Sequence, residues 1–142
     1  MKTITALKLS QEGAMTILTA ALQKGGDLRL PVSVAVVDDG GHLIAFARRD
    51  GAELYTVSIS IAKARSAAFT RFATGKKSPS GNERDDHHAL AITLAAGPGS
   101  FVSIPGGLPI SVEGQCVGGI GVSGGAQKDV DIARAGISAF EG

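Results

Sequence analysis

The sequence predicts an α+β fold, in which helices cover a mostly antiparallel β-sheet. Two pairs of apolar, β-branched runs are each joined by a short turn sequence, and amphipathic segments lie before, between and after them. Parallel strands would need a helical crossover within each pair, so successive hairpins favour antiparallel pairing. With 142 residues, 44% hydrophobic and 19% charged, the chain is expected to form one domain over residues 1–142.

The N-terminal half is expected to supply two helices and a hairpin. Apolar residues recur at helical spacing after Ser10, a suitable N-cap, and a pair of glycines follows, so the first helix is expected over residues 11–24. Residues 32–37 and 42–49 have the composition of strands and flank an Asp-Asp-Gly-Gly turn. The alanine-rich stretch 56–72 fits a helix that packs closely against its neighbours.

The C-terminal half is expected to supply a second hairpin and two helices. A polar loop leads into a short helix at residues 84–95. Residues 108–112 and 115–123 predict strands joined by a Glu-Gly turn, and residues 101–104 predict a further strand before them. The last glycine pair leads into an apolar stripe at helical spacing, which indicates a C-terminal helix.

Composition argues against several classes of partner. A net charge of +1 with five Phe, one Tyr and no Trp provides neither a basic surface for phosphates nor rings for stacking bases, so no nucleic acid is expected. No apolar run reaches the roughly 20 residues that cross a bilayer, and the N-terminus does not resemble a signal peptide. Cys116 is the only cysteine, which excludes an intrachain disulfide and favours a cytoplasmic location without membrane contact.

Four segments, in this order, carry a family resemblance: Val36-Val-Asp-Asp-Gly-Gly-His-Leu-Ile-Ala-Phe-Ala-Arg-Arg-Asp50, Ile61-Ala-Lys-Ala-Arg65, Gly106-Gly-Leu-Pro-Ile110 and Gly118-Gly-Ile-Gly-Val-Ser-Gly124. Together they resemble the GlcG/HbpS family (DUF336) of small haem-binding or haem-degrading proteins. The resemblance covers most of the chain and is poor over residues 75–100. It implies a profilin-like fold with a five-stranded antiparallel sheet flanked by helices, haem as the cofactor, and a homo-oligomer, often an octamer.

The second strand carries candidate site residues at both of its ends. His42, at the turn, can ligate haem iron or move a proton; alternatively, it hydrogen-bonds the Asp38-Asp39 carboxylates and fixes the turn. Arg48 lies roughly 20 Å further along an extended strand, so the two side chains cannot share a small site. Arg48, Arg49 and Asp50 gather near Gly51, and Arg48 and Asp50 are candidate ligand-binding residues. An Arg guanidinium suits a carboxylate, either a haem propionate or a small organic acid. The alternative is an Arg-Asp ion pair that holds the strand end.

Lys63 is a candidate catalytic amine, because it lies among alanines on its predicted helix. Partial burial would favour its neutral form, which acts as a base or forms a Schiff base. Alternatively, the side chain lies across apolar surface and keeps its ammonium group in water.

Glycines predict places where another group approaches the backbone closely. Gly106 and Gly107, before Pro109, would let backbone amides approach a ligand. Gly119 and Gly121 share one strand face that has almost no side-chain bulk, so a covering helix or a flat ligand must lie against it.

The run Asp85-Asp86-His87-His88 has the residue types that bind iron or zinc. Only Asp85 and His88 have the spacing that places two ligands on one helical face. Acidic residues are also favoured in the first turn of a helix by its dipole, so a helix start is the alternative.

Three hypotheses follow for function. The first is a non-covalent haem-binding protein with His42 near the iron, acting in haem degradation or iron handling. The second is an enzyme of the lyase or isomerase type, or a binding protein, for a small organic acid, in which Arg48 binds the acid and Lys63 or His42 moves a proton. The third is a structural or regulatory oligomer. The sequence lacks the C-x-x-C-H, H-E-x-x-H, G-x-S-x-G and Walker motifs.

Overall fold

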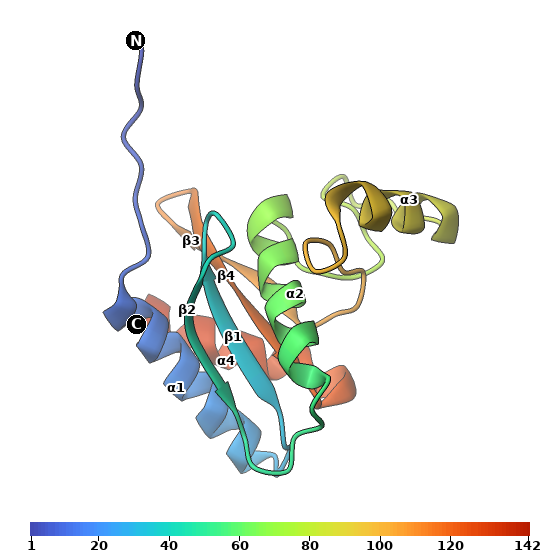
Figure 1. Ribbon diagram of the computed structural model, residues 1–142. Helices are drawn as coiled ribbons and strands as arrows, with labels where there is room; N and C mark the ends of the chain where they lie inside the picture. The colour runs from blue at the N-terminus through green and yellow to red at the C-terminus, as the bar shows by residue number, and fades with distance from the viewer.

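The computed structural model describes residues 1–142 and contains a four-stranded sheet with helices on both faces (Figure 1). The helices are α1 (Gln11–Asp27), α2 (Thr56–Thr70), α3 (Asp86–Ala96) and α4 (Asp129–Glu141), with a short 3-10 helix, η1 (Ala126–Lys128), before α4. The strands are β1 (Ser33–Asp38), β2 (Leu43–Arg48), β3 (Gly107–Val112) and β4 (Gln115–Ser123).

The two predicted hairpins form one antiparallel sheet in the order β2-β1-β4-β3. They join through pairing of β1 with β4, in which Val37 lies opposite Gly119 and Ala35 opposite Gly121. Glu113 and Gly114 both have positive φ values, +51° and +77°, as a tight two-residue hairpin turn requires. The α+β class and the antiparallel pairing are therefore confirmed.

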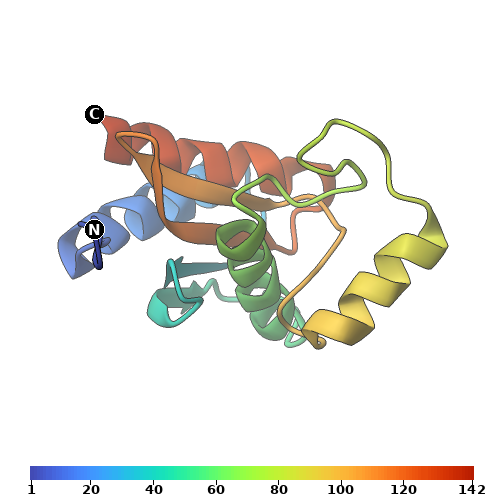
Figure 2. The same ribbon diagram turned by 90° about the horizontal axis from the view of Figure 1, so that it is seen from above.

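Helices cover the two sheet faces unequally. α1 and α4 lie together on one face and α2 lies alone on the other (Figures 1 and 2). Because successive residues of a strand face opposite sides, Val34 and Val36 of β1 join the larger core beneath α1 and α4. Ala35 and Val37 join a smaller cluster beneath α2.

The predicted fifth strand is wrong, because residues 101–104 are not in a strand. The Val102 amide donates to the Ser66 side chain of α2 at 3.1 Å, a bond that replaces a backbone partner in the sheet. The Phe101 side chain is buried, with the Arg84 guanidinium 5.1 Å from its ring centre. The segment is therefore held against α2 and Arg84, with Phe101 as its buried apolar residue.

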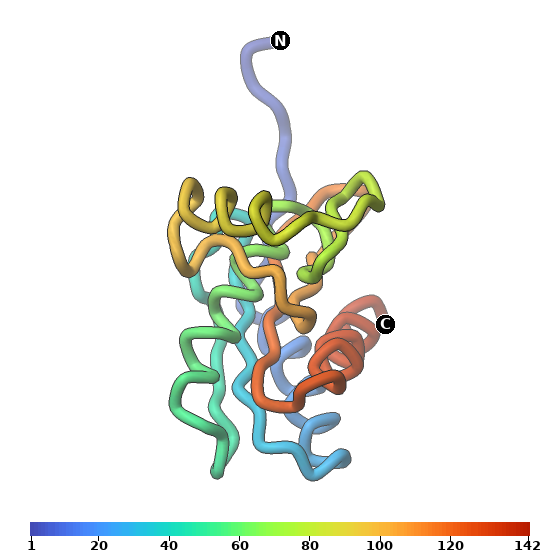
Figure 3. Tube along the Cα trace, turned by 90° about the vertical axis from the view of Figure 1, so that its right-hand side faces the viewer, coloured from blue at the N-terminus to red at the C-terminus, as the bar shows by residue number.

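The predicted helices are all present. α1 ends three residues later than expected, because Gly25 lies inside its last turn. A Cβ at Gly25 would lie 3.0 Å from the Val32 side chain, so this glycine serves packing rather than termination. α3 runs crosswise to α2 at one end of the molecule (Figure 3). None of the helices combines the length and the apolar character needed to cross a membrane.

Candidate functional site

The turn between β1 and β2 is organised by the carboxylate of Asp38. Its Oδ1 accepts hydrogen bonds from the backbone amides of Gly40 and His42, both at 2.9 Å. The same oxygen lies 3.3 Å from Nδ1 of the His42 ring. The His42 side chain is 81% exposed, and its Nε2 makes no hydrogen bond within the chain. Asp38 therefore fixes one side of the imidazole and leaves the other accessible.

The pKa of Asp38 lies below its ordinary value. Partial burial opposes ionisation, but the amides of His42 and Gly40 and the nearby imidazole stabilise the carboxylate more strongly. Because the pKa is lower in the folded than in the unfolded chain, ionised Asp38 stabilises the fold above the unfolded value of about 3.9. This contribution is lost as the pH falls through the folded value.

We expect Asp38→Asn to remove this acid dependence. The unfolding free energies of wild type and variant, measured by urea titration, should differ by a constant amount between about pH 5 and 7 and converge below about pH 4. A difference that stays constant to pH 3 would show that the Asp38 charge adds no stability. The substitution Asp50→Asn, at the far end of β2, is a control.

Sequence reasoning did not select Arg65 and Phe69, which α2 places against the same turn. Nη1 of Arg65 donates to the Gly41 carbonyl at 3.1 Å, and Nε donates to the Gly99 carbonyl at 3.0 Å. The guanidinium lies 5.3 Å from the centre of the Phe69 ring. Gly41 has φ +81°, and a Cβ there would lie 2.5 Å from that ring. The four-residue spacing of Arg65 and Phe69 was the available signal.

The opposite end of β2 has a hollow of about 450 Å³, but Arg48 does not line it. Arg48 is exposed and pairs with Ser33 across the strands. Its neighbour Arg49 lines the hollow and donates to the Leu22 carbonyl at 3.0 Å. The residues around the hollow are Gly26, Arg29, Leu30, Pro31, Arg49, Asp50 and Gly51. Arg49 and Asp50 therefore lie where a ligand could bind, whereas Arg48 does not line this hollow and its role in ligand binding stays a prediction.

Lys63 is not accessible as a catalytic amine. Its side chain is 2% exposed, and its Nζ donates to Asp129 Oδ2 at 3.0 Å and to the Val122 carbonyl at 2.7 Å. The second carboxylate oxygen of Asp129 accepts the Gly125 amide at 2.7 Å. Both sequence interpretations of Lys63 are therefore wrong, because its ammonium group faces neither a ligand nor water. It joins α2 to β4 and to the start of α4.

Packing accounts for the glycines that were expected to approach a ligand. A Cβ at Gly119 would lie 2.2 Å from the Ala64 carbonyl oxygen, and one at Gly121 would lie 2.0 Å from that of Ser60. The covering helix α2 occupies this face, so no ligand fits against these two glycines.

The loop before β3 is also filled by protein. A Cβ at Gly106 would lie 2.8 Å from Lys63 Nζ, and one at Gly107 would lie 2.5 Å from the Lys63 carbonyl oxygen. The Gly107 amide donates to Thr74 Oγ1 at 2.8 Å, so it is not free for a ligand. Pro109 lies in β3, which is an edge strand, where a missing amide is tolerated.

The run Asp85–His88 begins a helix. Oδ1 of Asp85 accepts the His88 amide at 2.7 Å and caps α3. No group of three or more His, Cys, Asp or Glu side chains in the structure is arranged to hold a metal ion. A protein-only metal site therefore finds no support in these residues.

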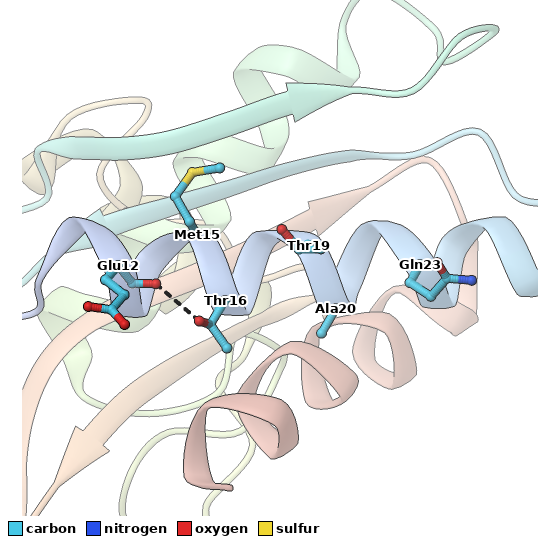
Figure 4. A pocket seen from close by; sticks show the side chains of 6 residues that line it. All are labelled: Glu12, Met15, Thr16, Thr19, Ala20 and Gln23. Carbon is cyan, nitrogen blue, oxygen red and sulfur yellow. Dashed lines mark hydrogen bonds between the residues drawn. The ribbon is translucent and has the colours of Figure 1, made fainter.

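The largest hollow, about 580 Å³, lies along the outer face of α1 and contains none of the predicted site residues (Figure 4). It is lined by Glu12, Met15, Thr16, Thr19, Ala20 and Gln23. The one side-chain hydrogen bond among these residues runs from Thr16 Oγ1 to the Glu12 carbonyl, within the helix. These residues form an exposed helical stripe and no enclosed cavity.

The chain is thus a small α+β protein. Its accessible candidate site residue, His42, lies at the turn between β1 and β2. The chain belongs to the family described as haem degrading protein HbpS-like, whose model matches residues 9–138. Protein GlcG of Escherichia coli K12 is 37% identical over 119 residues, which cover 84% of each chain.

Two solved structures with related sequences share the fold. A double mutant of Streptomyces reticuli HbpS superposes with a TM-score of 0.80 at 30% identity and covers 96% of this chain and 90% of its own. The PduOC:haem complex superposes with a TM-score of 0.75 at 26% identity and covers 94% and 95%.

Proposed function

We propose that this protein binds haem non-covalently, with His42 as the iron ligand, in a homo-oligomer. The observation that carries the proposal is the state of the imidazole: Asp38 holds Nδ1, while Nε2 is exposed and has no partner. Metal-ligating histidines almost always donate their second ring N–H to a carboxylate, carbonyl or water, which fixes the ring and raises its basicity. His42 already has that arrangement.

The surroundings of His42 fit part of a haem site. Phe69, against the same turn, is 43% exposed, and Leu43, the next residue along β2, is 51% exposed. Both offer apolar surface to a flat ring. However, none of the larger hollows of the single chain includes His42. A second subunit is therefore proposed to complete the walls of the site.

The similarity to known proteins supports the proposal that this protein binds haem. The related PduOC domain forms a complex with haem, and the family description names haem degradation. Haem breakdown or iron handling is accordingly the process that we propose haem binding to serve. Haem, when bound, would supply the redox chemistry of its iron, and His42, oriented by Asp38, would be the side chain that holds the iron.

Haemin titration followed by absorbance tests the proposal. Wild-type protein should give a sharp Soret band, and His42→Ala should weaken haemin binding at least about 100-fold because the iron loses its ligand. Asp38→Asn should weaken it by about 10-fold, through loss of ring orientation. His87→Ala and His88→Ala are matched controls, because these are the only other histidines and both are exposed. An unchanged Soret band and affinity in His42→Ala would contradict the proposal.

A role with a small organic acid has less support. Arg48, the residue expected to bind the acid, lies outside the hollow, and the amine of Lys63 is ion-paired and buried. The His42 imidazole, in contrast, is accessible, and Asp38 already orients it as the ring of a metal ligand is oriented.

A further inference from the structure

Helix α3 is apolar and yet has no buried residue. Seven of its eleven residues are Ala, Leu or Ile, and Leu90 and Leu94 are 58% and 71% exposed. α3 stands apart from the sheet and from the other helices (Figure 2). An isolated helix of this length is marginal in water, and a helix with this share of apolar residues is normally covered on its apolar side. α3 therefore presents apolar surface that nothing in the chain covers.

The uncovered side of α3 is a defined stripe. Ala89, Ile92 and Thr93 are half-buried and so lie on the side nearer the rest of the chain. Most of the other residues of α3 are exposed, and those opposite the half-buried side recur at helical spacing. They form what we call the α3 stripe, which comprises His87, Leu90, Ala91 and Leu94. The segment that follows, residues 98–100, borders a hollow of about 310 Å³ beside α2.

The charges at the two ends of the stripe are complementary. Asp86 lies in the first turn of α3 and has no cationic partner within 4.0 Å. Arg65, bonded to the Gly99 carbonyl just beyond the last turn, has no carboxylate partner within that distance. The apolar stripe is thus bordered by an unpaired carboxylate beside its first turn and by a guanidinium without a carboxylate partner beyond its last turn. Such a surface complements a second copy of itself that is rotated by 180°.

We propose that the α3 stripe is a self-association surface, on which α3 of a second copy packs antiparallel. A two-fold axis near the middle of the stripe brings Leu90 of one copy against Leu94 of the other and Asp86 beside Arg65 of the other. Such a contact uses the same patch on both copies and closes as a dimer. The two helix dipoles oppose each other, which is also favourable.

The hollow beside α2 enlarges this interface. Two helices of about 16 Å each bury less than the roughly 800 Å² per partner of a stable interface. Ser58, Ile61 and Ala62 of α2 line the hollow with Pro98, and they extend the surface that a second copy can cover. The α3 stripe is proposed as one contact of the homo-oligomer proposed above. This contact does not require bound haem.

Light scattering after size-exclusion chromatography of the haem-free protein tests this surface. The variant Leu90→Asp with Leu94→Asp should associate at least about 30-fold more weakly than wild type. Most of its far-ultraviolet circular dichroism should be retained, because neither leucine is buried. Leu54→Asp is the matched control, because Leu54 is also exposed, at 72%. A monomeric wild type, or an unchanged mass in the double variant, would overturn the proposal.

Cross-linking tests the antiparallel arrangement without relying on the charged variant. In a Cys116→Ser background, copies carrying Leu90→Cys are mixed with copies carrying Leu94→Cys and oxidised. The antiparallel contact predicts more disulfide dimer in the mixture than in either variant alone. Equal yields in all three samples would contradict the arrangement. Because no step involves haemin, a failure of the α3 contact is distinguished from a failure of haem binding by His42, which the haemin titration measures.

Discussion

Replacing Lys63 with Met is expected to lower the free energy of unfolding by about 3–5 kcal/mol, because the Asp129 carboxylate then stays buried without its partner. The two side chains are 2% and 4% exposed, so water cannot replace the lost ammonium group. Met keeps much of the length of the lysine stem, so packing changes little. Urea unfolding at neutral pH measures the loss.

Two further variants separate the charge effect from a general loss of packing. Lys128→Met removes the exposed pair with Asp131 at 3.7 Å and should change stability by less than about 1 kcal/mol. Combining Lys63→Met with Asp129→Leu removes both buried charges and should recover part of the loss. Recovery stays incomplete because Asp129 also accepts the Gly125 amide. A loss from Lys63→Met no larger than that from Lys128→Met would contradict the buried-pair interpretation.

The sequence predicted the hairpins and helices because their signals are local. The Asp-Asp-Gly-Gly turn and the Glu113-Gly114 turn each determine the geometry of a few neighbouring residues. The partner of Lys63 could not be predicted in the same way, because Asp129 lies 66 residues further along the chain. Until the fold brings α2 and the start of α4 together, nothing near Lys63 indicates that its amine is ion-paired.

At the candidate site, too, contacts between near neighbours in the sequence were open to prediction and contacts between distant residues were not. His42 and its carboxylate are four residues apart, so their contact was among the interpretations open from the sequence. Arg65 and Phe69 reach the turn from α2, more than twenty residues away, and depend on how that helix crosses the sheet. The bare face at Gly119 and Gly121 predicted a close neighbour, but the sequence alone did not decide between a helix and a ligand.

Gly121→Ala is expected to destabilise the fold by about 3 kcal/mol or more. The new Cβ would lie 2.0 Å from the Ser60 carbonyl oxygen and 2.5 Å from the Ala64 amide nitrogen. Both are backbone atoms of α2, so no side-chain rotation relieves the clash, and the helix must move off the sheet. The Lys63 ammonium group would move with α2, away from Asp129, so the variant should also lose part of the buried ion pair.

Gly40→Ala is the matched control for this effect. A Cβ at Gly40 would lie 3.0 Å from the His42 ring, an exposed side chain that can move into solvent at the cost of its contact with Asp38. Its cost in urea unfolding should stay below about 1 kcal/mol, whereas Gly121→Ala should unfold at clearly lower urea. If both variants lose the same small amount, then α2 tolerates a methyl group beneath it. The close contact of helix and sheet would then not explain why β4 carries glycine at that position.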